Sequence, residues 1–135
     1  MEQDILLLLG RVLVAVLLVY NGVNHFINTG MVTGYAEYKG VPQPQLAVYV
    51  SGILLLASGL SILLGVYPVV GGVLAALLSL VFAVMIHDFW TLEGDDRVNE
   101  MNHFLKNIGI AGGALVIASA GFEVWEWSLE MGLFL

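Results

Sequence analysis

Three histidines, together with Asn107 and Trp90, are the residues of this chain best suited to bind a ligand. The histidines are His25, His87 and His103. A neutral imidazole donates and accepts hydrogen bonds, ligates metals and changes charge near physiological pH. A cluster of such side chains could bind quinone carbonyls, relay protons, or ligate haem iron or another metal. The opposing interpretation is that each histidine lies in the lipid headgroup layer and bonds water or loop carbonyls.

The histidine spacing argues against a dedicated metal site. No HxxxH or HExxH pattern places two ligands on one helix face. Cysteine is absent, which excludes thiolate ligands, thiol redox chemistry and disulfides. We therefore expect no metal site, and we assign no catalytic residue.

Arg11 is the strong base within the first apolar stretch, residues 5–28. On a helix it would share one face with Ala15, Leu18, Gly22 and His25. Because polar groups at membrane depth usually face other helices, a cavity or water, we expect this face to meet partner helices.

Arg11 has two possible structural roles and a functional alternative. Its long side chain could reach nearby headgroups, or it could pair with Glu123, which the topology places at the same end. The functional alternative is a buried anchor or an anion contact. We prefer the structural roles, in which Arg11 and Glu123 act as polar anchors.

The composition identifies a membrane protein. Of 135 residues, 59% are hydrophobic and 11% are charged, with a mean hydropathy of +0.93. Soluble domains are closer to 45–50% apolar and roughly 25% charged. The acidic start, Met1-Glu2-Gln3-Asp4, is unlike a cleavable signal peptide, so we expect the first apolar stretch to be retained.

The apolar stretches predict an all-α fold, a bundle of four transmembrane helices in a single domain that covers residues 1–135. The expected spans are residues 5–26, 46–66, 68–87 and 104–122, with short connections between antiparallel neighbours. Alternating spans bring the ends of the first and third helices and the start of the fourth to one side, so all three histidines should meet there. Small residues dominate the expected inner faces, which lets helices approach closely in lipid.

The connecting segments are expected at the membrane surface. Residues 29–45 are predicted to form a short interfacial cap. Residues 88–102 are too charged to lie in hydrocarbon and are predicted to form a loop. The tail, residues 123–135, mixes tryptophans with glutamates and is predicted to lie along the interface as an amphipathic helix.

The charge is −7, and Arg11, Lys39, Arg97 and Lys106 are the strong bases. Nucleic acid is therefore an unsuitable partner, because phosphate binding needs clustered Lys and Arg. Acidic surfaces that are poor in lysine suggest a salt-loving organism. Three of the bases lie on the loop side, which puts both termini outside the plasma membrane by the positive-inside rule.

Several short motifs resemble the DoxX family of small four-helix membrane proteins. In chain order they are Gly10-Arg11, Gly22-xx-His25-Phe26, Gly40-Val41-Pro42, Gly59, Gly65, His87-Asp88-Phe89-Trp90, Phe104-Leu105-Lys106-Asn107 and Gly112-Gly113. Two positions depart from the family pattern, which often has lysine at His25 and commonly glutamate at Leu56. If that carboxylate takes part in family chemistry, this chain lacks it.

The resemblance implies a fold directly and a reaction by analogy. The family resembles the small membrane subunit of thiosulfate:quinone oxidoreductase. It therefore implies a quinone-associated membrane subunit of an oxidoreductase complex, with Arg11, His25, His87 and Asn107 at family positions and His103 and Trp90 added by topology. Quinone is the implied cofactor, with haem second. The chain has no flavin or cluster motif, so electrons would come from a redox partner subunit.

Two other functions compete with this one, and whether the chain is an enzyme is left open. The small-residue helix faces and the interfacial tail also suit a membrane scaffold or partner-binding protein. A small-molecule or lipid transporter or sensor is the third hypothesis. Four helices could line a path only as a homo-oligomer or with a partner.

Overall fold

The computed structural model describes residues 1–129 and shows an all-helical chain. Its elements are, in order, α1 (Glu2–Ile27), α2 (Thr29–Tyr38), α3 (Pro44–Leu64), α4 (Pro68–Ile86), the 3₁₀ turn η1 (Phe89–Thr91) and α5 (Gly94–Ala120). Four of them, α1, α3, α4 (extended through η1) and α5, are long and apolar enough to cross a membrane. The predicted all-α fold with four spans is confirmed.

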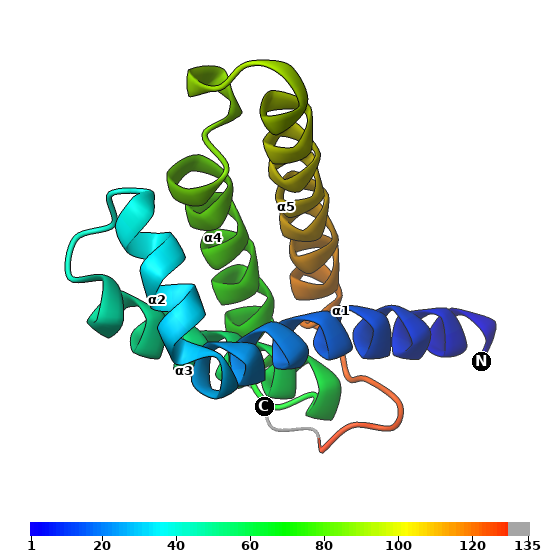
Figure 1. Cartoon of the computed structure of the whole chain (residues 1–135). Helices are drawn as coiled ribbons and strands as arrows, with labels where there is room; N and C mark the ends of the chain where they lie inside the picture. The colour runs from blue at the N-terminus through cyan, green and yellow to red at the C-terminus, as the bar shows by residue number, and fades with distance from the viewer. Residues whose placement is uncertain (130–135) are drawn as a thin grey trace.

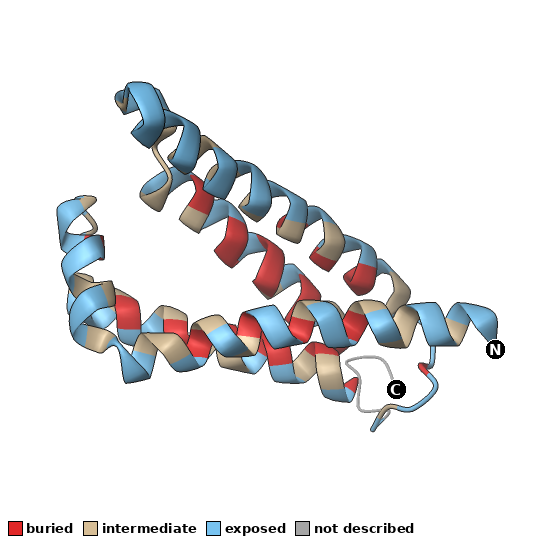
Figure 2. Ribbon diagram, turned by 45° about the vertical axis from the view of Figure 1, so that its right-hand side comes forward, coloured by how far each residue is buried: buried red, intermediate tan, exposed pale blue. Residues whose placement is uncertain are grey.

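The four long helices form two antiparallel pairs. Helix α1 packs along α3, and α4 packs along α5, while α3 and α4 join the pairs at one end (Figure 1). In Figure 2 the buried residues follow the lines along which the helices meet, and the outer faces are exposed. Large apolar side chains such as Leu6 and Leu13 lie on these outer faces, where a bilayer would cover them.

Small residues set the close approach of the helices. A methyl group added at Gly72 of α4 would lie 2.8 Å from the carbonyl oxygen of Ala114 in α5. One added at Gly52 of α3 would lie 2.9 Å from the Cβ of His25 in α1. Neither pair could pack as it does with a larger residue, so these glycines are needed for helix contact in lipid.

The turn between α3 and α4 follows from its residue types. Gly65 ends α3 with a φ of +67°, in the left-handed region that glycine adopts at little cost. Pro68 then occupies the first turn of α4, where its missing N–H is not needed. The two spans are therefore joined by a turn of three residues.

The connecting segments differ from the sequence-based predictions in three places. The predicted cap at residues 29–45 contains the helix α2. Helix α5 begins at Gly94, inside the predicted loop 88–102, because Asp95 and Asp96 in its first turn interact favourably with the helix dipole. The tail was predicted to be helical, but residues 121–129 form turns instead. Residues 130–135 lie outside the described part of the chain.

Candidate functional site

Three elements meet in a polar network at the end of the bundle where α4 passes into α5. The Nζ of Lys39, at the end of α2, lies 2.6 Å from Oδ1 of Asp88 and 3.8 Å from Oε2 of Glu100. The hydroxyl of Tyr35 donates to Oε1 of Glu100 at 2.7 Å. Glu100 Oε2 in turn accepts a hydrogen bond from Nδ1 of His87 at 2.8 Å. We call Tyr35, Lys39, His87, Asp88 and Glu100 the polar network.

The polar network is partly withdrawn from solvent. Exposed side-chain fractions are 5% for Lys39, 15% for both Glu100 and His87, and 29% for Asp88. The ammonium group of Lys39 faces two carboxylates, so it offsets the charge of one of them, while Glu100 also accepts hydrogen bonds from Tyr35 and His87.

The imidazole of His87 is oriented by its carboxylate partner. Because Glu100 accepts from Nδ1, that nitrogen carries a proton and Nε2 is left for another contact. The ring stacks on His103 with centroids 5.1 Å apart. His103 lies on the exposed side of α5, so the pair runs from the polar network to the surface.

Tyr35, like Lys39, lies outside the four membrane-crossing helices. Partial burial raises the pKa of its hydroxyl above the ordinary value, and the hydrogen bond to Glu100 raises it further. Tyr35 is therefore a hydrogen-bond donor throughout the physiological pH range.

Aromatic rings lie beside the polar network. Phe89 and Trp90 of η1 and Phe104 of α5 contact one another edge-on, with centroids 5.2 to 6.1 Å apart. The guanidinium of Arg97 lies over the Phe89 ring at 5.4 Å. Trp90 is half-exposed, so this cluster presents flat apolar surface next to ionisable groups.

The other predicted site residues lie apart from this network. Nδ1 of His25 bonds the carbonyl of Asn21 at 2.7 Å, and its ring lies 6.2 Å from that of Phe82. Within residues 1–129, His25 makes no hydrogen bond or ring contact with the other histidines. Asn107 donates to the carbonyl of His103 at 3.1 Å, within its own helix. The structure therefore joins two of the three histidines, and His25 and Asn107 stay predictions.

The sequence reasoning did not assign Tyr35, Lys39, Asp88 or Glu100 to the site. Lys39 is one of only four strong bases in the chain. Its position in a connecting segment between two spans was the available signal. The partners could not be found from spacing, because Asp88 lies 49 residues away and Glu100 lies 61 residues away.

Arg11 organises the opposite end of the bundle. It is 1% exposed. Its Nε and Nη2 donate to the carbonyls of Ile62 and Leu63, at 3.1 and 2.7 Å, at the end of α3. Nη1 and Nη2 also donate to the carbonyls of Glu126 and Trp127, at 3.1 and 3.3 Å.

The contacts of Arg11 fit neither of the two structural roles expected for it. Its guanidinium lies 4.7 Å from the centre of the Trp125 ring, under the C-terminal segment. It neither extends to the headgroups nor pairs with Glu123, whose carboxylate is not among its partners in the described residues. Backbone carbonyls near the negative end of the α3 dipole balance the charge instead. Arg11 is a buried anchor, and the expected pairing with Glu123 is not formed.

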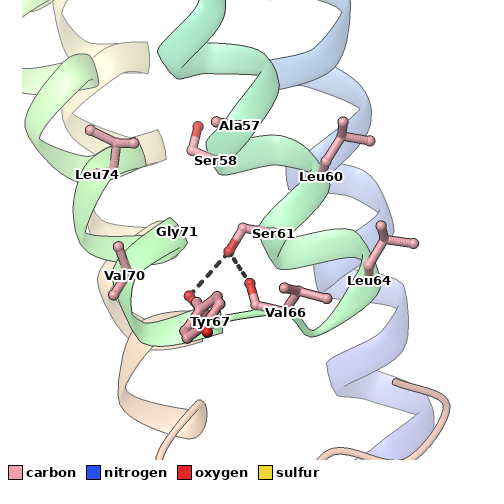
Figure 3. A pocket seen from close by; sticks show the side chains of 10 residues that line it. All are labelled: Ala57, Ser58, Leu60, Ser61, Leu64, Val66, Tyr67, Val70, Gly71 and Leu74. Carbon is pink, nitrogen blue, oxygen red and sulfur yellow. Dashed lines mark hydrogen bonds between the residues drawn. The ribbon is translucent and has the colours of Figure 1, made fainter. Parts of the chain in front are cut away.

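A shallow groove also lies at the Arg11 end, between α3 and α4 (Figure 3). It has a volume of about 370 Å³, and aliphatic side chains such as Leu60 and Leu74 form most of its wall. The Ser61 hydroxyl lies 2.6 Å from the carbonyl of Val66 and 3.1 Å from that of Tyr67. The Ser61 hydroxyl is thus engaged within the chain, and among residues 1–129 no acidic, basic or histidine side chain lines the groove.

Comparison with known proteins identifies the family. The DoxX family model matches residues 6–88, more than half of the chain. The chain belongs to the DoxX family. It is also 29% identical over 119 residues to the inner membrane protein YphA of Escherichia coli (strain K12), covering 88% of this chain and 85% of that protein. No solved structure matches it.

The DoxX match divides the polar network. Four of its members, Tyr35, Lys39, His87 and Asp88, lie within the matched residues, whereas Glu100 follows them. Among residues 1–129 no group of three His, Asp or Glu side chains is arranged to hold a metal ion. The four apolar helices and the family membership together establish a multi-pass membrane protein.

Proposed function

We propose that this DoxX protein is a quinone-associated membrane subunit of an oxidoreductase complex. The observation that supports the proposal most directly is the hydrogen-bonded series Tyr35–Glu100–His87, which continues through the stacked ring of His103. It joins protonatable groups to an exposed imidazole at one end of a membrane bundle.

The residues present fit a quinone headgroup. A quinone oxygen needs a hydrogen-bond donor, and a quinone takes up two electrons and two protons when it is reduced. Nε2 of His87 and the ring of His103 are available as donors or acceptors, and the apolar faces of Phe89, Trp90 and Phe104 can contact a flat ring. Glu100 would orient His87 and hold its proton.

Electrons would come from a partner. The sequence contains no cysteine for a cluster and no nucleotide-binding fingerprint. The relative in Escherichia coli is an inner membrane protein, and we propose the corresponding location, the plasma membrane, for this chain. A redox partner would then bind on the side of the polar network.

One observation favours a scaffold instead. Lys39 bonds Asp88, and Glu100 bonds Tyr35 and His87, as in a clamp that fastens α2 to α4 and α5. A clamp of this kind needs no ligand. The two functions differ in whether His103 and Trp90 contact an added molecule.

Quinone binding can be tested by tryptophan fluorescence in mild detergent, with ubiquinone-1 as the probe. Quinones quench nearby tryptophans, and Trp90 lies beside the proposed site whereas Trp125 and Trp127 lie at the Arg11 end. We expect saturable quenching that is lost in Trp90→Phe and weakened at least tenfold in His87→Ala and His103→Ala. If the parent protein shows saturable quenching and both histidine variants show the same quenching, the proposed site is contradicted.

Two further measurements complete that test. His25→Ala is the matched control, because His25 lies outside the polar network; loss of binding in this variant alone would place the site at the contact of α1 with α4. Mass spectrometry of lipid extracts from protein purified out of native membranes would show a stoichiometric quinone. Absence of both quenching and bound quinone would favour the scaffold.

A further inference from the structure

We infer that α2 is a hinged cap, latched onto the α4–α5 end by Lys39 and Tyr35, and that release of the latch uncovers the Thr33 hydroxyl. This inference concerns the movement of one helix and holds whether or not a quinone binds. Its basis is the small buried surface of α2, the non-helical backbone at its two ends, and the few side chains that hold it to α4 and α5.

Helix α2 is short and contributes little to the core. It has ten residues, of which only Ala36 is buried. Met31 and Tyr38 are 68% and 77% exposed. A helix of this length is marginal alone in water, so its position depends on contacts with its neighbours.

The backbone departs from helical geometry at both ends of α2, and the Thr29 hydroxyl keeps its first turn attached to the last carbonyls of α1. Asn28 separates it from α1 with non-helical angles, φ −112° and ψ 37°. Beyond its other end, Gly40 has a φ of +75°, which glycine adopts readily. Side chains added at Gly30 or Gly34 within the helix would meet nothing within 4 Å, so no tight contact holds that side.

The latch consists of two contacts between residues far apart in sequence. Lys39 is bonded to Asp88 at 2.6 Å, and its side chain is 5% exposed. Tyr35, one helical turn earlier, donates to Glu100 at 2.7 Å. Both side chains lie on the edge of α2 that faces α4 and α5. Removing the Lys39 charge leaves Asp88 and Glu100 without their ammonium partner, so the closed position loses its main attraction.

Thr33 shows what the closed cap covers. Its hydroxyl oxygen is enclosed and has no hydrogen-bond partner among the described residues. Thr29, Thr33 and Ala36 share the face of α2 that packs on α1 and α3. Buried hydroxyls usually have a hydrogen-bond partner, whereas the Thr33 hydroxyl has none among the described residues while the cap is closed. Opening of the cap would let water or a polar ligand bond to it.

The experiment uses the absence of cysteine from the natural chain. Thr33→Cys is introduced into the full-length protein in mild detergent, and its reaction with a water-soluble methanethiosulfonate is timed without added quinone. We expect slow labelling in this background and labelling about tenfold faster when Lys39→Met is added. Lys106→Met is the matched control, because Lys106 is exposed and has no ion-pair partner among the described residues; it should leave the rate unchanged.

Two reference positions separate cap opening from loss of the fold. Met31→Cys, on the exposed side of α2, should label quickly in every background. Ser58→Cys, at a core position that is 0% exposed, should stay unreactive. A reactive Ser58→Cys in the Lys39→Met background would mean that this change disrupts the core. In that case Asp88→Asn, which preserves side-chain volume, replaces Lys39→Met as the variant that breaks the latch.

The inference is overturned if Thr33→Cys labels at the same rate with and without the latch while both reference positions behave as stated. It is also overturned if Thr33→Cys is as reactive as Met31→Cys in the latched protein. Because no quinone is present, the result is independent of the quenching measurements.

Discussion

Replacing Arg11 with methionine tests whether this side chain anchors the fold. The change keeps a long side chain but removes all four hydrogen bonds to the carbonyls of Ile62, Leu63, Glu126 and Trp127. Two of these carbonyls end α3, where a helix has no partners of its own for them. The other two belong to exposed residues that water can reach.

The magnitude follows from the two carbonyls that water cannot readily reach. A buried acceptor left without a partner costs about 1–3 kcal/mol, so two cost roughly 2–6 kcal/mol. Relief from burying a charge offsets part of this. We expect Arg11→Met to lower the free energy of unfolding by about 3 kcal/mol. Arg11→Lys keeps the charge but lacks the planar fork and should lose about half as much.

The assay is unfolding in mild detergent with increasing SDS, followed by helical circular dichroism and tryptophan fluorescence. Trp125 lies 4.7 Å from the guanidinium and should report the loss directly. Arg97→Met is the matched control, because Arg97 is exposed on α5, and it should change stability by less than about 0.5 kcal/mol. An Arg11→Met protein within about 1 kcal/mol of the parent would refute the anchor role.

Other predictions concern helix packing, pH and orientation. Gly72→Ala should destabilise the protein by about 1–3 kcal/mol, because its methyl would lie 2.8 Å from a carbonyl oxygen of α5. Gly109→Ala is the control, because its methyl would meet no atom within 4 Å, and it should be neutral or stabilising by up to about 1 kcal/mol. Unfolding of both variants in SDS measures the difference. The pKa of Tyr35 is raised in the folded state, so its contribution to stability is complete below about pH 10, the pKa of unfolded tyrosine, and is lost as the pH rises further. Tyr35→Phe should therefore reduce the loss of stability above about pH 10. Alkaline unfolding that is the same in Tyr35→Phe and the parent protein would contradict this prediction. Met31→Cys should resist a membrane-impermeant thiol reagent in intact cells if the loops face the cytoplasm, and rapid labelling would reverse the proposed orientation.

The sequence by itself determined the membrane class, the four spans and their approximate ends. Long uncharged stretches can satisfy their backbone in lipid only as helices or closed barrels, so composition and length suffice for this part of the fold. The sequence also put His87 and His103 on one side, because alternating spans bring those helix ends together. Helix α2 and the first turns of α5 were missed, since both lie in polar segments without a hydrophobic period.

Only the tertiary structure decided which polar groups meet. Lys39 and Asp88 come from different connecting segments, and their contact depends on how α2 lies across the bundle. Arg11 has carbonyl partners, which every residue carries, so no residue type at any spacing could reveal them. Sequence patterns record the periodicity of single helices, whereas charge pairing across a membrane bundle depends on distances that exist only after the helices have packed.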